Sequence, residues 1–247
     1  AAYLHNGDSK KLNFDINNFK KFKDKIDYII VKDHPPKIIP FEKNDSEIKK
    51  SEKKILNSIM RDNFQREQLI KGLNHLDAED LIILSDLDEI PDLNKLNLDE
   101  INNEIIIFKQ KMFYYKFNLL YENFEWFGSK AVKKKNFISP QWLRNIKSKK
   151  YPIWRLDTFF SKNKYTNIQF IEDGGWHFTC IKKPEDIHRK LLTFAHHQDY
   201  ETSKISLDDL RKKINEKKVL YDHSRDKKIS NKWFSETTLK KIDLSLL

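Results

Sequence analysis

A short apolar segment that ends abruptly in acidic residues is the feature that most constrains the fold of this chain. Residues 81–84 read LIIL and are followed at once by SDLDEIP over residues 85–91. A continuous apolar run of this length is typical of a central strand that is buried on both faces of a sheet. In open α/β sheets, ligands bind beyond the carboxyl ends of such strands. We therefore expect an α/β fold in which residues 85–91 lie at a binding site.

Three carboxylates fall within four positions of this acidic segment. Asp86 and Asp88 are two residues apart, so both can turn toward one point if the chain bends there, and Pro91 helps to stop the strand. Hard oxygen ligands of this kind suit Mg²⁺ or Mn²⁺. A diphosphate would supply the remaining ligands, and the metal would neutralise it as a leaving group. The alternative interpretation is an acidic loop that caps the next helix.

The composition excludes several classes of protein. Of the 247 residues, 38% are hydrophobic and 13% are aromatic, which is enough for a folded core. No apolar run approaches the ~20 residues that a membrane span needs. The five glycines form neither a GxGxxG motif nor a Walker A loop. The single cysteine, Cys180, excludes a disulfide framework and a zinc site of paired cysteines, and its apolar context is typical of a core residue.

Lysine supplies almost all of the basic excess behind the net charge of +10. Its even spread along the chain indicates a solvated surface rather than a nucleic-acid interface, which is the alternative interpretation of the clusters at residues 133–135 and 147–150. A basic surface favours an anionic substrate such as a nucleotide diphosphate. The sequence starts without an initiator Met, a signal peptide or an anchor. We therefore expect a cytoplasmic protein, with an upstream piece missing from this sequence.

Hydrophobic periodicity predicts the other elements. Helices are expected over residues 46–73, from Pro184 onward and over residues 206–218. Strands are expected at residues 27–31, 81–84, 105–108, 111–118 and 168–171, with an irregular pattern over 122–160 and a polar tail over 221–247. Strands alternate with helices early in the chain, and no linker is evident. We therefore expect a single α/β domain over residues 1–247.

A second candidate segment for a site is EDGGWH at residues 172–177. Two adjacent glycines, Gly174 and Gly175, indicate a backbone conformation that other residues resist, or a close approach of the backbone to a ligand. His177 follows them at once, and Asp173 precedes them. The alternative is a tight turn between two strands, with His177 packed in the core.

Two of the expected helices carry charged residues that could serve a site. On helix 46–73, Asp62 and Arg66 project in the same direction as the apolar stripe and can pair with each other. Arg66 then either reaches the site at the strand end or forms a structural ion pair at the edge of the core. On the helix that begins at Pro184, Lys190 and its neighbours either hold phosphate or an acceptor, or lie on the surface. These neighbours are Arg189, Thr193, His196 and His197.

Five segments follow one another in the order and approximate spacing of a known family. They are NFQREQLIKGL (63–73), LIILSDLDEIP (81–91), FYYKFNL (113–119), GGWHFT (174–179) and KLLTFAHHQ (190–198). In these segments the chain resembles the β-1,4-mannosyl-glycoprotein β-1,4-N-acetylglucosaminyltransferase family, to which the bisecting GlcNAc transferase belongs. HNGDSKKLNF (5–14) also looks like the family's early THxGxPKxLxF region, so the resemblance covers roughly residues 3–200.

The resemblance implies a nucleotide-sugar-dependent, inverting glycosyltransferase with a GT-A-like mixed sheet flanked by helices. Family members begin with a strand and a helix ahead of the position of Ala1, so we expect this chain to lack that first strand–helix unit. Asp86 and Asp88 carry over as the DxD motif that holds Mn²⁺ or Mg²⁺ and the diphosphate, and His177 is expected within reach of the same metal. The donor would be a UDP-sugar, UDP-GlcNAc above all, and the acceptor a glycan hydroxyl.

An inverting transfer needs a general base near the acceptor hydroxyl. Asp173 is the first candidate for this base and Glu89 is the second. Aromatic side chains, among them Trp126 and Tyr115, are expected to stack on sugar faces. Two alternatives stay open. One is a metal-dependent phosphohydrolase or nucleotidyltransferase that uses the same carboxylates, and the other is a non-catalytic carbohydrate-binding relative.

Overall fold

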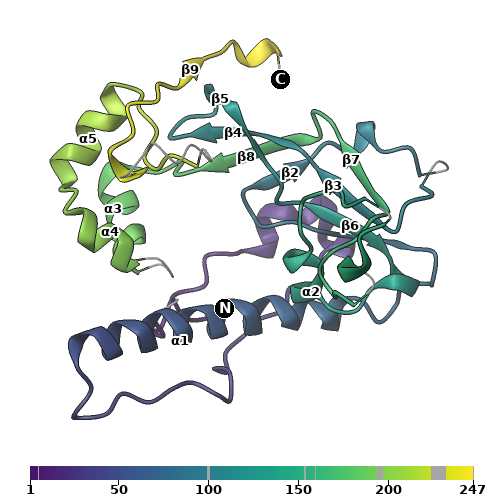
Figure 1. Ribbon diagram of the computed structural model, residues 1–247, viewed down its shortest axis with the longest axis horizontal. Helices are drawn as coiled ribbons and strands as arrows, with labels where there is room; N and C mark the ends of the chain where they lie inside the picture. The colour runs from purple at the N-terminus through teal and green to yellow at the C-terminus, as the bar shows by residue number, and fades with distance from the viewer. Residues whose placement is uncertain are drawn as a thin grey trace. The chain divides into compact units, whose positions relative to one another are not determined.

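A computed structural model of the chain describes residues 1–4, 6–98, 101–152, 154–158, 160–193, 197–223 and 232–246. The contacts between residues divide the chain into two compact units (Figure 1). The first unit contains Ala1–Leu76 and Arg189–Thr202, and the second contains Asp77–His188 and Ser203–Leu247. The expectation of a single domain stays a prediction. Among the described helices, none combines the length and the apolar composition that crossing a bilayer requires.

The first unit is built on the long helix α1, Glu47–Glu67. Its N-cap is Ser46, whose side chain accepts a hydrogen bond from the backbone N–H of Lys49, and a 3₁₀ turn over Gln68–Gly72 continues it. The helix predicted over residues 46–73 is therefore confirmed. The strand predicted at residues 27–31 is wrong, because this segment runs as irregular chain with Tyr28 and Ile30 exposed.

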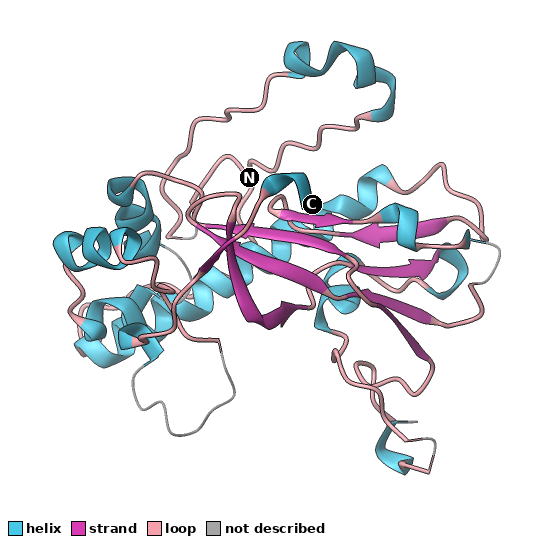
Figure 2. Ribbon diagram, turned by 90° about the horizontal axis from the view of Figure 1, so that it is seen from above, coloured by secondary structure: helices cyan, strands magenta, loops and turns pink. Residues whose placement is uncertain are grey.

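All the described strands lie in the second unit, where they form two mixed sheets. The strands are β1 (Leu81–Leu84), β2 (Glu89–Pro91), β3 (Ile105–Phe108), β4 (Gln110–Tyr114), β5 (Leu119–Trp126), β6 (Lys130–Lys133), β7 (Ile168–Ile171), β8 (Gly175–Thr179) and β9 (Lys240–Lys241). One sheet has the order β1-β6-β3-β7 and the other β2-β8-β4-β5-β9. The β3–β7 and β4–β8 pairs are parallel and the other pairs are antiparallel. Figure 2 shows these strands lying together. The α/β class expected from the sequence is confirmed.

In the first sheet, β3 is an inner strand and β1 is an edge strand. All four residues of β3 are buried, because β3 pairs with β6 on one side and β7 on the other. β1 pairs with β6 and stands at the end of the strand order, with Ile82 and Leu84 buried and Leu81 and Ile83 half-buried. The limits predicted for β1 are confirmed, but its predicted central position is wrong. Apolarity over four residues does not distinguish an edge strand from a central one.

The region predicted to be irregular, residues 122–160, contains regular structure. It holds most of β5, all of β6, and the short helix α2 over Pro140–Asn145, which Ser139 caps. The strand predicted over 111–118 ends earlier, at Tyr114, because Tyr115 adopts a φ of 63°. The expected polar tail contributes β9, which pairs with β5.

Three further predictions are confirmed. Residues 168–171 form β7, and helices begin at Pro184 and after Ser206. These helices are α3 (Pro184–Thr193) and α5 (Leu207–Asn215), and α4 (His197–Ser203) lies between them in the sequence. Ser206 and Asp209 form a capping box at the start of α5, with each side chain accepting from the other's backbone N–H.

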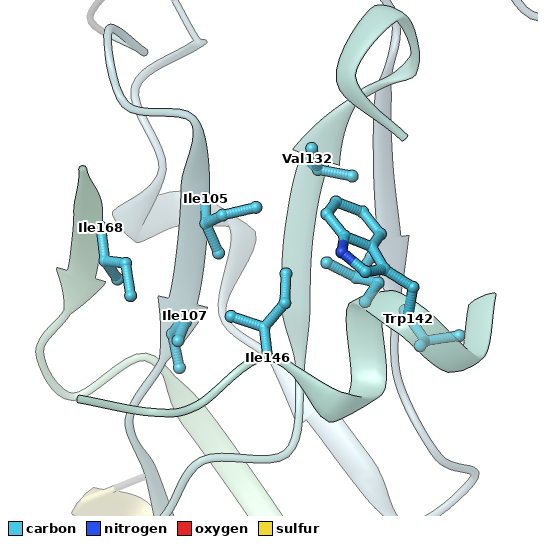
Figure 3. Packing of buried hydrophobic residues seen from close by; sticks show 8 residues of the cluster. Ile105, Ile107, Val132, Trp142, Ile146 and Ile168 are labelled. Atoms are coloured by element: carbon cyan, nitrogen blue, oxygen red, sulfur yellow. The ribbon is translucent and has the colours of Figure 1, made fainter. Parts of the chain in front are cut away.

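α2 is fixed on the first sheet by a buried apolar cluster. The cluster contains Leu84, Ile105, Ile107, Val132, Trp142, Leu143, Ile146 and Ile168. Figure 3 shows Trp142 beside Val132, and Ile146 lying between them and the strand that carries Ile105 and Ile107. The indole Nε1 of Trp142 donates to the carbonyl of Lys162 at 2.8 Å, so its one polar atom is satisfied.

A buried lysine holds the end of the same helix. Lys130 lies on β6, and its Nζ donates to the carbonyl oxygens of Arg144, at 2.8 Å, and of Ile146. These carbonyls belong to the last turn of α2, where backbone acceptors lack helical partners. Burial, with a smaller effect of the nearby Arg144 guanidinium, lowers the pKa of Lys130 from 10.5 to about 8.

Lys130 should make the stability of the chain depend on pH in the alkaline range. Between the folded pKa of about 8 and the ordinary value of 10.5, the unfolded chain binds a proton that the folded chain has released. The free energy of unfolding therefore rises with pH across this window, by on the order of 2 to 3 kcal/mol from this one group. Urea unfolding of Lys130→Met at a series of pH values should lack this rise. Lys241→Met, at an exposed position, should keep it, and equal pH profiles for wild type and Lys130→Met would contradict the assignment.

Candidate functional site

The acidic segment forms a tight bend directly after β1. The backbone N–H of Glu89 donates to the carbonyl of Asp86 at 3.0 Å, and the N–H of Asp86 donates to Oε2 of Glu89 at the same distance. This bend turns the chain from the first sheet into β2 of the second sheet. The side chains of Asp86 and Asp88 are 39% and 41% exposed. Both carboxylates are therefore within reach of a ligand.

The second candidate segment meets the acidic bend because β2 pairs with β8 (Figure 1). Glu89 lies opposite His177 in this pair, and the N–H of Phe178 donates to the carbonyl of Asp88 at 2.8 Å. The imidazole Nε2 of His177 then lies 3.6 Å from Oδ2 of Asp88. The structure thus brings together His177 and Asp88, which are far apart in the sequence.

Gly175 permits this close pairing of β2 and β8. Its φ is +124°, and a Cβ placed on it would lie 2.1 Å from the carbonyl oxygen of Ile90. Any other residue would push the two strands apart. The positive φ of Gly175 is the backbone conformation that other residues resist, which is one of the two interpretations that the sequence allowed, and the close approach is to the backbone of β2.

Trp126, at the end of β5, contacts both His177 and the carboxylate of Glu89. Its ring stacks on that of His177 with centroids 4.5 Å apart and planes 16° from parallel. Its Nε1 donates to Oε1 of Glu89 at 2.7 Å. Trp126 was expected to stack on a sugar face, which stays a prediction; the structure stacks its ring on His177.

Arg144 is the site residue that sequence reasoning missed. From the last turn of α2, its Nη1 donates to both carboxylate oxygens of Glu89, at 2.9 and 3.1 Å, and to the carbonyl of Gly128 at 2.8 Å. Its Nη2 donates to Oδ2 of Asp86 at 2.8 Å. Only the serine–proline helix start at 139–140 hinted at α2, and nothing local linked Arg144 to carboxylates more than fifty positions earlier.

Glu89 acts as the anchor of this network. Its side chain is 1% exposed. Its two oxygens accept hydrogen bonds from Arg144, from Trp126 and from the backbone N–H of Asp86. A carboxylate that is buried and bonded in this way orients its neighbours and has little access to an acceptor. Its expected role as the second candidate base stays a prediction that these contacts do not favour.

Asp88 and His177 offer ligand atoms that suit a divalent cation. A carboxylate oxygen and an imidazole nitrogen both bind Mn²⁺, and a separation of 3.6 Å allows one ion to bind both at bond lengths of about 2.0–2.6 Å. Asp86 would have to share or give up its bond to Arg144 in order to join them. Over the described ranges, the side chains form no ready-made group of three or more metal-binding residues. Asp88 and His177 therefore fit a cation, and a cation that also bound Asp86 would have to displace it from Arg144.

The other predicted site residues of the second unit lie apart from this network. Asp173, with a φ of 47°, pairs with Lys111 at 3.1 Å and is well exposed. Tyr115 is buried, and its hydroxyl donates to the carbonyl of Lys218 at 3.1 Å. Burial raises the pKa of this phenol well above its usual range. These contacts give Tyr115 a place in the packing rather than on a sugar-binding surface.

Two predicted site residues belong to the first unit. Arg66 pairs with Asp62 at 3.2 Å, as the helical spacing predicted, and its side chain is mostly buried. Lys190 is exposed on α3. Roles for these residues beside Asp86 stay predictions. His196 lies outside the described residues, and so does the side chain of His197.

A second histidine, His223, also lies beside Trp126. The ring of His223 lies 6.3 Å from that of Trp126 and 5.1 Å from that of Phe124, and its Nε2 is 2.8 Å from the hydroxyl of Tyr114. Burial, with a smaller effect of His177, lowers the pKa of His223 to about 4. His223 is therefore neutral near pH 7 and packs as an aromatic residue beside the site.

Comparison of the chain with protein-family models, with curated proteins and with solved structures gives no match. The family resemblance therefore rests on the quoted sequence segments and stays a prediction.

Gly128 should be intolerant of substitution, because the network occupies the space beside its Cα. A Cβ at this position would lie 1.8 Å from Oε1 of Glu89 and 2.2 Å from Nε1 of Trp126. Gly128→Ala should lower the free energy of unfolding by about 2 to 4 kcal/mol, through overpacking and the loss of the bonds to Glu89. Gly72→Ala is the matched control, because its Cβ would meet Ile29 at an ordinary 3.6 Å. Similar denaturant midpoints for the two variants would contradict the described network.

Proposed function

We propose that this protein is a metal-dependent glycosyltransferase of the GT-A type. It transfers N-acetylglucosamine from UDP-GlcNAc to a hydroxyl group of a glycan, with inversion at the anomeric carbon and release of UDP. The proposal rests on one observation above all: at the end of β1, the partly exposed carboxylate of Asp88 lies 3.6 Å from the buried imidazole of His177. The resemblance of the acidic and GGWH segments to the glycosyltransferase family supports the donor class.

The residues of the site have distinct roles in this proposal. Asp88 and His177 would hold a divalent cation, Mn²⁺ or Mg²⁺, and Asp86 would complete its protein ligands. When bound, this cation would neutralise the charge that develops on the leaving diphosphate. Trp126 stacks on His177 and fixes the plane of the imidazole. Asp173 is exposed, so a glycan hydroxyl can reach it and pass a proton to it as the new glycosidic bond forms.

The first test is the binding of UDP to the wild-type chain and to Asp88→Asn, by calorimetry with Mn²⁺ or with EDTA. We expect Mn²⁺ to strengthen UDP binding to the wild type and to have little effect on the variant. Transfer from UDP-GlcNAc should fall at least ~10²-fold in Asp88→Asn, because the charge on the leaving group is no longer neutralised. Asp208→Asn, an exposed aspartate on α5, is the control and should behave as the wild type.

Other outcomes of this test favour other functions. Equal UDP affinity in Mn²⁺ and in EDTA would overturn the metal-dependent proposal. Cleavage of UDP-GlcNAc at the same rate with and without glycan acceptors would point to a phosphohydrolase. Glycan binding without any UDP binding would point to a non-catalytic carbohydrate-binding protein.

The base assignment is tested separately with Asp173→Asn. Loss of the proton acceptor should lower kcat by about 10²–10⁴-fold while UDP binding persists, since the base is not needed to hold the donor. Glu172→Gln is the matched control: Glu172 is the neighbouring exposed carboxylate, and it pairs with Lys109 at 2.7 Å. If Asp173→Asn abolishes UDP binding, or if both variants lose the same activity, Asp173 is not the base.

A further inference from the structure

We propose that Arg144 is a diphosphate-binding residue whose release depends on the metal. Its guanidinium holds Asp86 in the structure. When a cation takes Asp86, the freed Nη2 binds phosphate oxygens of the donor. This inference rests on the proposed function, because it assigns a further ligand to the same donor site.

The two ends of the guanidinium have different partners. Nη1 contacts a buried carboxylate and a backbone carbonyl, those of Glu89 and Gly128. Nη2 contacts Asp86, whose side chain is 39% exposed and lies on the bend beside Asp88. Nη1 is therefore held by buried partners, while Nη2 contacts a partly exposed carboxylate that a ligand could reach.

The rest of the structure keeps this cation in position. α2 is held on the sheet by Trp142, Leu143 and Ile146 in the apolar cluster, and Lys130 binds the carbonyl of Arg144 itself. A guanidinium stays charged at all ordinary pH values. If Asp86 leaves, Arg144 keeps its place through Glu89, and its outer nitrogen requires another oxygen acceptor.

A metal ion and Arg144 compete for the charge of the same carboxylate. Each bond that Asp86 makes to the metal weakens its attraction for Nη2. Phosphate oxygens are strong acceptors for arginine, and the diphosphate would be the anion closest to the released nitrogen. Arg144 should therefore oppose the binding of the bare cation and favour the binding of the cation with a diphosphate. These opposite effects distinguish the proposal from a purely structural role.

The test uses Arg144→Lys in the full chain, with folding checked by circular dichroism. A lysine has one ammonium group, which can satisfy the buried Glu89 but cannot hold Asp86 at the same time. Mn²⁺ alone, followed by electron paramagnetic resonance of the free ion, should bind about 3- to 10-fold more tightly to this variant. UDP in saturating Mn²⁺ should bind about tenfold more weakly, the fold-change expected for one lost charged hydrogen bond. Arg211→Lys is the matched control, because Arg211 also bridges two carboxylates, Glu185 and Asp208, away from the acidic bend.

A second variant, Asp86→Asn, keeps the inference testable if Arg144→Lys does not fold. Removing the charge of Asp86 weakens its hold on Nη2, while Glu89 still binds Nη1. UDP in EDTA should therefore bind more tightly to Asp86→Asn than to the wild type, and, where Arg144→Lys folds, adding it to this variant should reverse the gain. Unchanged or weaker UDP binding to Asp86→Asn in EDTA would overturn the inference.

The outcomes separate this inference from the proposed function. If Mn²⁺ strengthens UDP binding to the wild type but Arg144→Lys changes both affinities in the same direction, or neither, the metal site stands and the role of Arg144 is structural. If Mn²⁺ alone binds to Arg144→Lys and not to the wild type, the competition is established. If Mn²⁺ alone binds to neither protein but still strengthens UDP binding to the wild type, this inference fails and the proposed function stands. If Mn²⁺ also has no effect on UDP binding, both proposals fail.

Discussion

The arrangement of the site depends on the burial of one carboxylate, that of Glu89. A charged group removed from water needs a cation and further hydrogen-bond donors, or it destabilises the fold. Glu89 obtains them from α2, from β5 and from the acidic bend itself. Removing the cation from such a pair costs about 3 to 5 kcal/mol. Because Glu89 needs these hydrogen-bond partners, it holds α2, β5 and the acidic bend together at the site, although they come from different parts of the chain.

The polar contacts around this acid continue behind the bend. Ser85 donates to the hydroxyl of Ser129 at 2.7 Å, and the amide of Gln110 donates to the same hydroxyl at 3.1 Å. Ser129 and Gln110 are both fully buried. These bonds join the start of the bend to β4 and to the residue before β6. The position of Asp86 and Asp88 thus follows from buried polar pairing as much as from the apolar strand ahead of them.

The sequence predicted those parts of the fold and the site that depend on local signals. The run of residues 81–84, the bend that follows it and the capped helices have cues within a few residues. The resemblance also predicted His177 close to Asp88, and the β2–β8 pairing is what brings the two side chains to within 3.6 Å of each other. The edge position of β1 and the role of Arg144 follow from contacts across long sequence separations. No periodicity or motif in the chain encodes those contacts.

At position 144 the chain uses arginine where a planar fork that reaches two carboxylates is required. Arginine supplies only a small minority of the 47 basic residues, so the lysine-rich composition does not account for Arg144. Lys130 shows what lysine does in the same neighbourhood: its single nitrogen binds backbone carbonyls at the end of α2. Arg144 instead divides its planar fork between a buried carboxylate and an exposed one. A lysine could neutralise either acid, but only an arginine can remain anchored to Glu89 while it exchanges its contact with Asp86 for another anion.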